Sequence, residues 1–277
     1  NATPKLSLGL YESVVWKTNR TLGSNGFDIN YLNPVIFLRP VEYSINSPDN
    51  MLLGLNFKYN VHSSSYAYSQ FLLDEFVLDE FKNGKNFWGN KFGCQLGYKY
   101  YDFITKNLVT QLEYNFVRPY TYAHQNPAQN YGHYNQPLAH PVGANFSEII
   151  LLNNYSFNRF SFNTKFIFIK YGGKILGDPT SYGNNIYMST GNFAELNPIS
   201  NIGSGRPDDY NIKMYQGNLT TVNYQSISVS YLLSKKTNLK CTIEVINRFF
   251  KNEDEEINSQ VFNFGIMTDL FNNYYDY

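Results

Sequence analysis

The stretch Phe92-Gly-Cys-Gln-Leu-Gly-Tyr-Lys-Tyr100 decides the fold. Its even positions carry apolar or aromatic side chains, and its odd positions carry Gly, Gln and Lys. Successive side chains of a β-strand point to opposite faces of a sheet, so a period of two predicts a strand with one apolar and one polar face.

The same alternation recurs along the whole chain. It begins near residues 5, 51, 66, 92, 108, 147, 160, 218, 238 and 258. Helical spacing of three to four residues does not continue over a useful length anywhere. The sequence therefore predicts an all-β fold of about ten antiparallel strands.

Two antiparallel architectures produce such stripes: a soluble sandwich with facing apolar sides, or a transmembrane β-barrel with the apolar side toward lipid. The segments are longer than the usual five or six residues of soluble strands and match tilted spanning strands. Tyr and Phe gather at strand ends, as at Tyr98 to Tyr101, which suits aromatic girdles. We expect an outer-membrane barrel formed by a single domain over residues 1–277, while a secreted sandwich lectin stays an alternative.

The connections between the predicted strands alternate in length. Short joins fall near 61–65, 157–160 and 234–238, and we expect long external loops near 19–48, 118–146 and 172–217. Short turns at one end and long loops at the other are typical of outer-membrane barrels. Ten strands either close a small barrel by themselves or form the C-terminal part of a larger one.

Composition excludes several function classes. The 277 residues include 22 Lys and Arg against 22 Asp and Glu, and aromatic residues make up 18% of the chain. Nucleic-acid binding needs a basic surface and disorder goes with few aromatics, so neither fits. Apolar runs fall well short of the about 20 residues of a spanning helix. We interpret Cys94 and Cys241 as small hydrophobic wall residues, although one disulfide between them stays open.

Several blocks in a fixed order carry a family resemblance. They are Leu32–Glu42, Asn50–Gly54, Phe71–Phe76, Arg118-Pro-Tyr-Thr-Tyr-Ala-His124, and Tyr131-Gly-His-Tyr-Asn-Gln-Pro-Leu-Ala-His-Pro-Val-Gly-Ala-Asn145. The series resembles the Wzi capsule-assembly family of outer-membrane barrels, and it is most similar to the RemB-like gliding motility proteins of Bacteroidota. The resemblance implies a non-catalytic outer-membrane protein tied to surface polysaccharide or cell-surface motility. It also implies a barrel larger than ten strands, with further strands before Asn1.

The connection near 118–146 holds the candidate site. Flat aromatic rings beside amides suit stacking on sugars and hydrogen bonding to them. We therefore predict a saccharide- or partner-binding loop, for which the alternative is a loop folded against or into the barrel mouth. The candidate residues are Tyr120, Tyr122, His124, Tyr131, His133, Tyr134, Asn135 and His140. The three histidines lack a nearby Cys or carboxylate in sequence, so we predict neither a metal site nor a cofactor.

Catalytic signals are weak. The carboxylate pairs Asp74-Glu75 and Asp79-Glu80 could suit a glycosidase or calcium, but no partner motif accompanies them. We expect a non-enzymatic surface anchor or scaffold in the outer membrane. Its expected partners are the lipid bilayer, lipopolysaccharide, surface polysaccharide and components of the gliding or type IX secretion machinery. The rival function is a passive porin-like channel, which gains if residues 118–146 project outward and loses if they fold inward.

Overall fold

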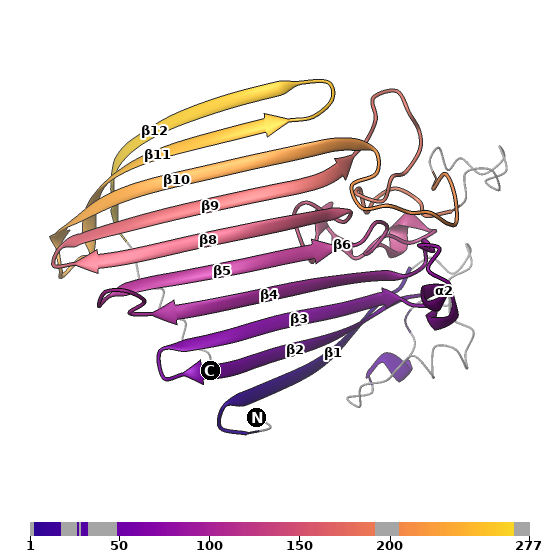
Figure 1. Cartoon of the computed structure of the whole chain (residues 1–277), viewed down its shortest axis with the longest axis horizontal. Coiled ribbons are helices and arrows are strands. Elements are labelled where there is room, and N and C mark those ends of the chain that lie inside the picture. Colours follow the sequence, from indigo (N-terminus) through magenta and orange to yellow (C-terminus); the bar gives the residue numbers. More distant parts are fainter. Residues whose placement is uncertain (1–2, 18–26, 28, 33–48, 192–204, 269–277) are drawn as a thin grey trace.

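The computed structural model describes residues 3–17, 27, 29–32, 49–191 and 205–268. Ten long strands dominate this part of the chain (Figure 1). They are β1 (Leu6–Val15), β2 (Asn50–His62), β3 (Ser65–Glu75), β4 (Lys91–Tyr101), β5 (Leu108–Val117), β8 (Phe146–Phe157), β9 (Phe160–Gly173), β10 (Asn218–Ser234), β11 (Leu239–Lys251) and β12 (Glu256–Thr268). The smaller elements are a hairpin of β6 (Gly132–His133) and β7 (Gln136–Pro137), helix α2 (Leu78–Lys82), and the 3-10 turns Ile29–Leu32 and Pro127–Gln129.

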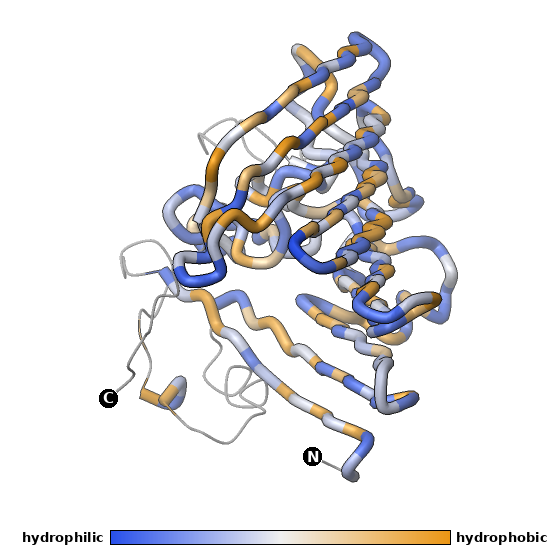
Figure 2. The backbone as a smooth tube through the Cα atoms, turned by 90° about the vertical axis from the view of Figure 1, so that its left-hand side faces the viewer, coloured by the Kyte–Doolittle hydropathy of each residue, from blue (hydrophilic) through white to orange (hydrophobic). Residues whose placement is uncertain are grey.

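All ten long strands belong to one antiparallel sheet in which each strand pairs with the next long strand along the chain. This confirms the all-β prediction, and the observed strands begin close to the ten predicted positions. Within the described residues the sheet is not closed, because β1 and β12 each have a neighbour on one side. Figure 2, which looks at the short-turn end, shows the sheet as a curved wall.

The two faces of the wall differ as the alternation predicts. Leu96, Tyr114 and Ile149 are cross-strand neighbours on the outer, convex face, and all three are exposed. The adjacent positions on these three strands point to the inner, concave face. There Gln95 of β4 lies opposite Asn115 of β5, and Asn115 lies opposite Glu148 of β8. The outer face is therefore apolar, whereas the middle of the inner face carries amides and carboxylates.

The connections also divide between the two ends of the sheet (Figure 1). Tight turns follow β2, β8 and β10 at one end, and the longer connections gather at the other. The β5–β8 connection comprises residues 118–145. The β9–β10 connection comprises residues 174–217, of which 192–204 lie outside the described residues. The loop predicted near 19–48 lies outside the described residues except for 27 and 29–32.

The hydrophobic core sits at the loop end, between the inner face and the two long connections. Leu52, Leu72, Val117 and Phe146 supply the sheet side of this core. The connections supply the other side through Tyr122, Ala123, Ala144 and Ile186. Burying a large apolar side chain contributes roughly 1.5–3 kcal/mol, so this core holds the connections against the wall.

Glycines on the inner face make room for tyrosine rings. Tyr11 lies across Gly54 on the neighbouring strand, and Tyr68 lies across Gly97. A Cβ added at either glycine would come within 2.0 Å of the ring. Tyr68 is held in this position because its hydroxyl donates to Glu113 at 2.5 Å and accepts from Gln111 at 2.8 Å.

Cys94 and Cys241 are both free thiols on the outer face, in agreement with their interpretation as small wall residues. Among the described residues, no helix has the length and apolar character needed to cross a membrane.

Candidate functional site

The β5–β8 connection folds inward across the loop end of the sheet and is tied to three strands there. The Tyr122 backbone N–H donates to the buried Asp74 carboxylate of β3 at 2.7 Å. The Lys91 ammonium of β4 donates to the Ala123 carbonyl at 3.1 Å, and the Asn50 amide of β2 donates to the Gln129 carbonyl at 3.0 Å. These bonds fix the connection against the inner face rather than in solvent.

Asn145 joins the two long connections. Its buried side-chain amide donates to the carbonyls of Gly172, Tyr182 and Gln216 at 2.9 to 3.1 Å. Its side-chain oxygen accepts from the Tyr215 backbone N–H at 2.6 Å. One fully buried side chain therefore holds residues up to 71 positions away in sequence. A side-chain amide carries two donor hydrogens and an acceptor oxygen on one group, and this makes the arrangement possible.

His140 is likewise used for structure. Its ring stacks on Phe146 with centroids 4.4 Å apart, and its Nε2 lies 3.0 Å from the buried Glu148 carboxylate. The Glu148 carboxylate also accepts from Asn115 at 2.9 Å. This chain of contacts fastens the end of the β5–β8 connection to the polar centre of the inner face.

The β6–β7 hairpin is the part of this connection that projects into solvent. Tyr134 and Asn135 form its tip with positive φ angles of 47° and 57°, which suit a two-residue hairpin turn. The Tyr134 side chain is 88% exposed, and its ring lies edge-on to the His133 ring at 4.2 Å between centroids. The tip therefore presents an aromatic pair next to an amide.

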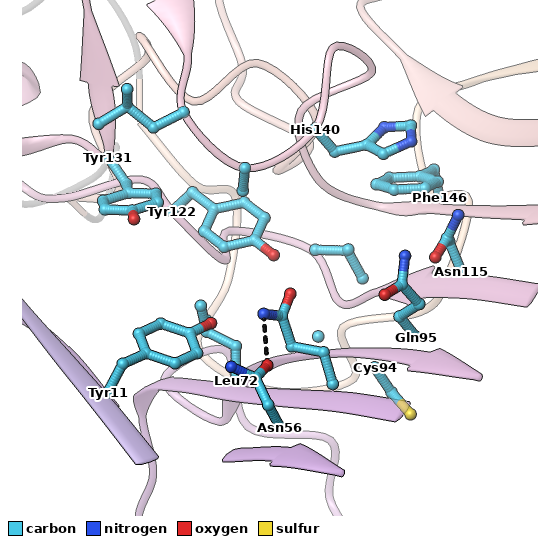
Figure 3. Close-up of a pocket in the computed structure, with 15 residues that line it drawn as sticks. Tyr11, Asn56, Leu72, Cys94, Gln95, Asn115, Tyr122, Tyr131, His140 and Phe146 are labelled. Atoms are coloured by element: carbon cyan, nitrogen blue, oxygen red, sulfur yellow. Dashed lines mark hydrogen bonds between the residues drawn. The ribbon is translucent and has the colours of Figure 1, made fainter. Parts of the chain in front are cut away.

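A cavity of about 440 Å³ lies beneath the connection, on the inner side of the sheet (Figure 3). Tyr11, Tyr122 and Tyr131 form one side of it, and the ring centroids of Tyr122 and Tyr131 are 6.0 Å apart. Amides form the other side: Gln70 donates to Asn56 at 2.8 Å, and Gln95 and Asn115 lie further along. Aromatic faces opposite amides can stack on and hydrogen bond to a polar ring such as a sugar.

Seven of the eight predicted site residues are thus divided among three environments, and His124 is in a fourth. Tyr120 and Tyr122 are buried, so Tyr120 has no exposed face on which a sugar could stack. Burial raises the pKa of both phenols well above the ordinary value. Tyr131 and His140 line the cavity, whereas His133, Tyr134 and Asn135 form the exposed hairpin.

His124 is mostly enclosed at the base of the connection. Its Nδ1 accepts from the Asn126 backbone N–H at 3.2 Å. Burial lowers the pKa of this imidazole, and the nearby Lys91 ammonium acts in the same direction, while the Glu75 carboxylate opposes it. The neutral form is therefore the one that fits this position.

Potential metal-ligating side chains are dispersed in the part of the chain that the structure describes. No three His, Cys, Asp or Glu side chains come together there as a metal group would need. Asp74 holds the Tyr122 backbone, and Asp79 and Glu80 lie on the short helix α2.

The sequence alone did not single out the sheet side of the cavity. Tyr11, Asn56, Gln70 and Gln95 come from four different strands, β1 to β4. In the sequence, these four residues share one feature: each stands at an inner-facing position of the strand alternation, where most residues are polar. Strand pairing brings these positions together. Predicting the cavity would therefore have required the pairing register of the strands as well as their two-residue period.

Comparison with family models, with curated proteins and with solved structures finds no match for this chain.

Proposed function

We propose that this sheet is the wall of an outer-membrane β-barrel that acts as a closed surface anchor or scaffold, with loops that engage surface polysaccharide. The apolar outer face and the polar middle of the inner face support this placement, as does the gathering of the long connections at one end of the sheet. Strand lengths of 10 to 17 residues suit a tilted crossing of the hydrocarbon layer.

Closure of the wall is part of the proposal. In a sheet of ten successive antiparallel strands, the first and last strands run in opposite directions. They can pair directly, or through an even number of further strands, and keep every neighbour antiparallel. Closure removes both exposed edges, which a bilayer requires because it offers no water to satisfy free backbone groups.

The observation that carries the functional part is the inward fold of the β5–β8 connection. Its ties to Asp74, Lys91 and Asn50 place it over the inner face, where it narrows any passage along that face. This favours an anchor over the rival passive channel. The binding surface that we propose combines the exposed tip at Tyr134 with the cavity lined by Tyr11 and Tyr131.

The partners follow from the same placement. The outer face would contact the bilayer and lipopolysaccharide, and the loop end would face surface polysaccharide or protein components of the gliding or type IX secretion machinery. The charge balance and aromatic content of the loops suit neutral, hydroxyl-rich ligands better than nucleic acid.

The experiment begins with full-length protein purified from membranes. We expect heat-modifiable gel mobility and retention of the host's surface polysaccharide on immobilised protein. Tyr134→Ala should reduce retention several-fold, and Ile104→Ala, an exposed residue in a turn at the opposite end of the sheet, should leave it unchanged. Protein that stays soluble without detergent would contradict the barrel, and absence of retention at saturating polysaccharide would contradict the binding role.

A further inference from the structure

A second pocket, of about 300 Å³, opens on the outer face at the loop end. Phe92 and Phe116 form its floor as cross-strand ring neighbours on β4 and β5, with centroids 6.2 Å apart. Ile212 and Met214 of the β9–β10 connection also line it. The pocket lies on the opposite side of the sheet from the cavity beneath the β5–β8 connection, since Gly93 and Val117 line that cavity and alternate with this floor.

Two cations line this pocket, Arg118 and Lys213, and no Asp or Glu does. Arg118 makes no ion pair with a carboxylate of the described residues. Its Nε is buried and has no hydrogen-bond partner among those residues, and its Nη2 reaches the Phe87 carbonyl at a long 3.5 Å. The guanidinium carbon lies 5.6 Å from the Phe92 ring centroid.

Such a cation is costly without a counter-charge. Burial lowers the pKa of Arg118, yet a guanidinium keeps its proton in proteins, so the positive charge persists. An anion in the pocket would compensate the charge and occupy the free donor. A guanidinium fork matches the oxygens of a phosphate in a bidentate arrangement, with Lys213 as a second, exposed cation.

A third cation, Lys170, lies on the same outer face as Arg118. Lys170 of β9 lies 4.5 Å above the Tyr215 ring, and the Tyr215 hydroxyl contacts Ser147 at 2.8 Å. Ser147 of β8 pairs with Lys170 of β9, and it also lies opposite Phe116 at the loop end of β5. The cations thus stand at the loop end of an apolar face, which is the arrangement that an amphiphile with a charged head requires.

We propose that the Arg118–Lys213 pocket binds the phosphate of an anionic lipid headgroup, with the lipid's acyl part against Phe92, Phe116 and the apolar face beyond them. The lipid source of this phosphate rests on the proposed membrane placement. The charge and geometry of the pocket do not depend on a role in polysaccharide binding.

The test is native mass spectrometry of the full-length protein in detergent micelles, titrated separately with phosphatidylglycerol, with the matching diacylglycerol and with inorganic phosphate. We expect phosphatidylglycerol to bind roughly tenfold or more tightly than diacylglycerol, which is the scale of a hydrogen bond to a charged group. Inorganic phosphate should bind more weakly than phosphatidylglycerol, because it lacks the apolar part.

The variants isolate the two cations. Arg118→Gln should abolish the preference for phosphatidylglycerol, and Lys213→Gln should weaken it about threefold, as expected for an exposed charge. Lys235→Gln changes an exposed lysine in the tight turn at the opposite end and should leave the preference intact. Lys213 is exposed, so its variant remains informative even where Arg118→Gln fails to fold.

Equal affinity for the two lipids, or an equal effect of Lys213→Gln and Lys235→Gln, would overturn the proposal. Inorganic phosphate that binds as tightly as phosphatidylglycerol would overturn the assignment to a lipid. These titrations contain no polysaccharide. Failure of polysaccharide retention with an intact lipid preference would therefore refute the proposed function alone.

Discussion

The inner face of the sheet is buried on its β2 side and solvent-exposed on its β12 side. On β2, the inner-facing Leu52 at the loop end is 0% exposed, whereas Ile257 at the equivalent end of β12 is 43% exposed. Both belong to strands with the same alternation, and both point to the concave side. Among the described residues, the β5–β8 and β9–β10 connections pack over the inner face of the first strands, whereas β12 is exposed along nearly its whole length. Burial in this molecule is therefore set by docked loops.

The largest expected effect on stability comes from substitutions that test this difference in burial. Leu52→Ala should lower the free energy of unfolding by about 2–5 kcal/mol, because it leaves a cavity in the core beneath the β5–β8 connection. Ile257→Ala should cost less than about 1 kcal/mol, since its side chain is already 43% exposed. Urea unfolding in detergent micelles, followed by tryptophan fluorescence, compares the two. Equal losses would show that the covered and bare regions do not differ in packing.

A smaller effect is expected from inner-face glycines. Gly97→Ala would push a methyl group into the ring of Tyr68, which Glu113 and Gln111 hold in place, and should cost about 1–3 kcal/mol. Gly265→Ala on β12 is the matched control, because no atom lies within 4 Å of the added carbon. The same urea experiment should show a change within about 0.5 kcal/mol for the control. A Gly97→Ala variant as stable as the control would refute the close ring contact.

Acidification should loosen the covered region selectively. The folded state holds His124 with a lowered pKa, so below pH of about 6.5 the unfolded state binds more protons than the folded one. The stability contributed by this site is therefore complete above that pH and declines as pH falls. Hydrogen exchange should show faster opening of residues 120–131 at pH 5.5 than at pH 8, with little change in β11 and β12.

His124→Gln supplies the control for that pH effect. It removes the titrating imidazole and should flatten the pH dependence of opening over residues 120–131. An unchanged pH dependence in the variant would assign the effect to another group.

The smallest effect on stability is expected at the hairpin tip. Tyr134→Ala should change the free energy of unfolding by less than about 0.5 kcal/mol, because the ring is 88% exposed. The same variant should reduce polysaccharide retention, so the tip would separate binding from stability. A large loss of stability would mean that the tip belongs to the docked part of the connection.

The sequence was sufficient for the strands because their signal is local. Alternation over ten or so residues predicts each strand, and tight turns such as Phe157 to Phe160 predict its antiparallel neighbour. The docking of the connections could not be predicted in the same way. Asn145 contacts Gln216 across 71 positions, and no local pattern distinguishes this asparagine from the others in the chain.

The candidate site was predicted in part. The β5–β8 connection was identified by its aromatic and amide content, but composition does not separate the buried Tyr120 from the exposed Tyr134. Both residues have positive φ, so the backbone does not separate them either. What differs is the surrounding packing, since Tyr120 donates to the Ser181 carbonyl of the other connection at 2.9 Å.

The most direct test of the central claim, that the inward β5–β8 connection makes the protein a closed anchor, is conductance in planar bilayers. Full-length protein is compared with a variant in which residues 126–139 are replaced by a short Gly-Ser linker. We predict that the unaltered protein gives no stable channels and that the variant opens them. Stable channels in the unaltered protein, with the same conductance as the variant, would contradict the account and favour the passive channel.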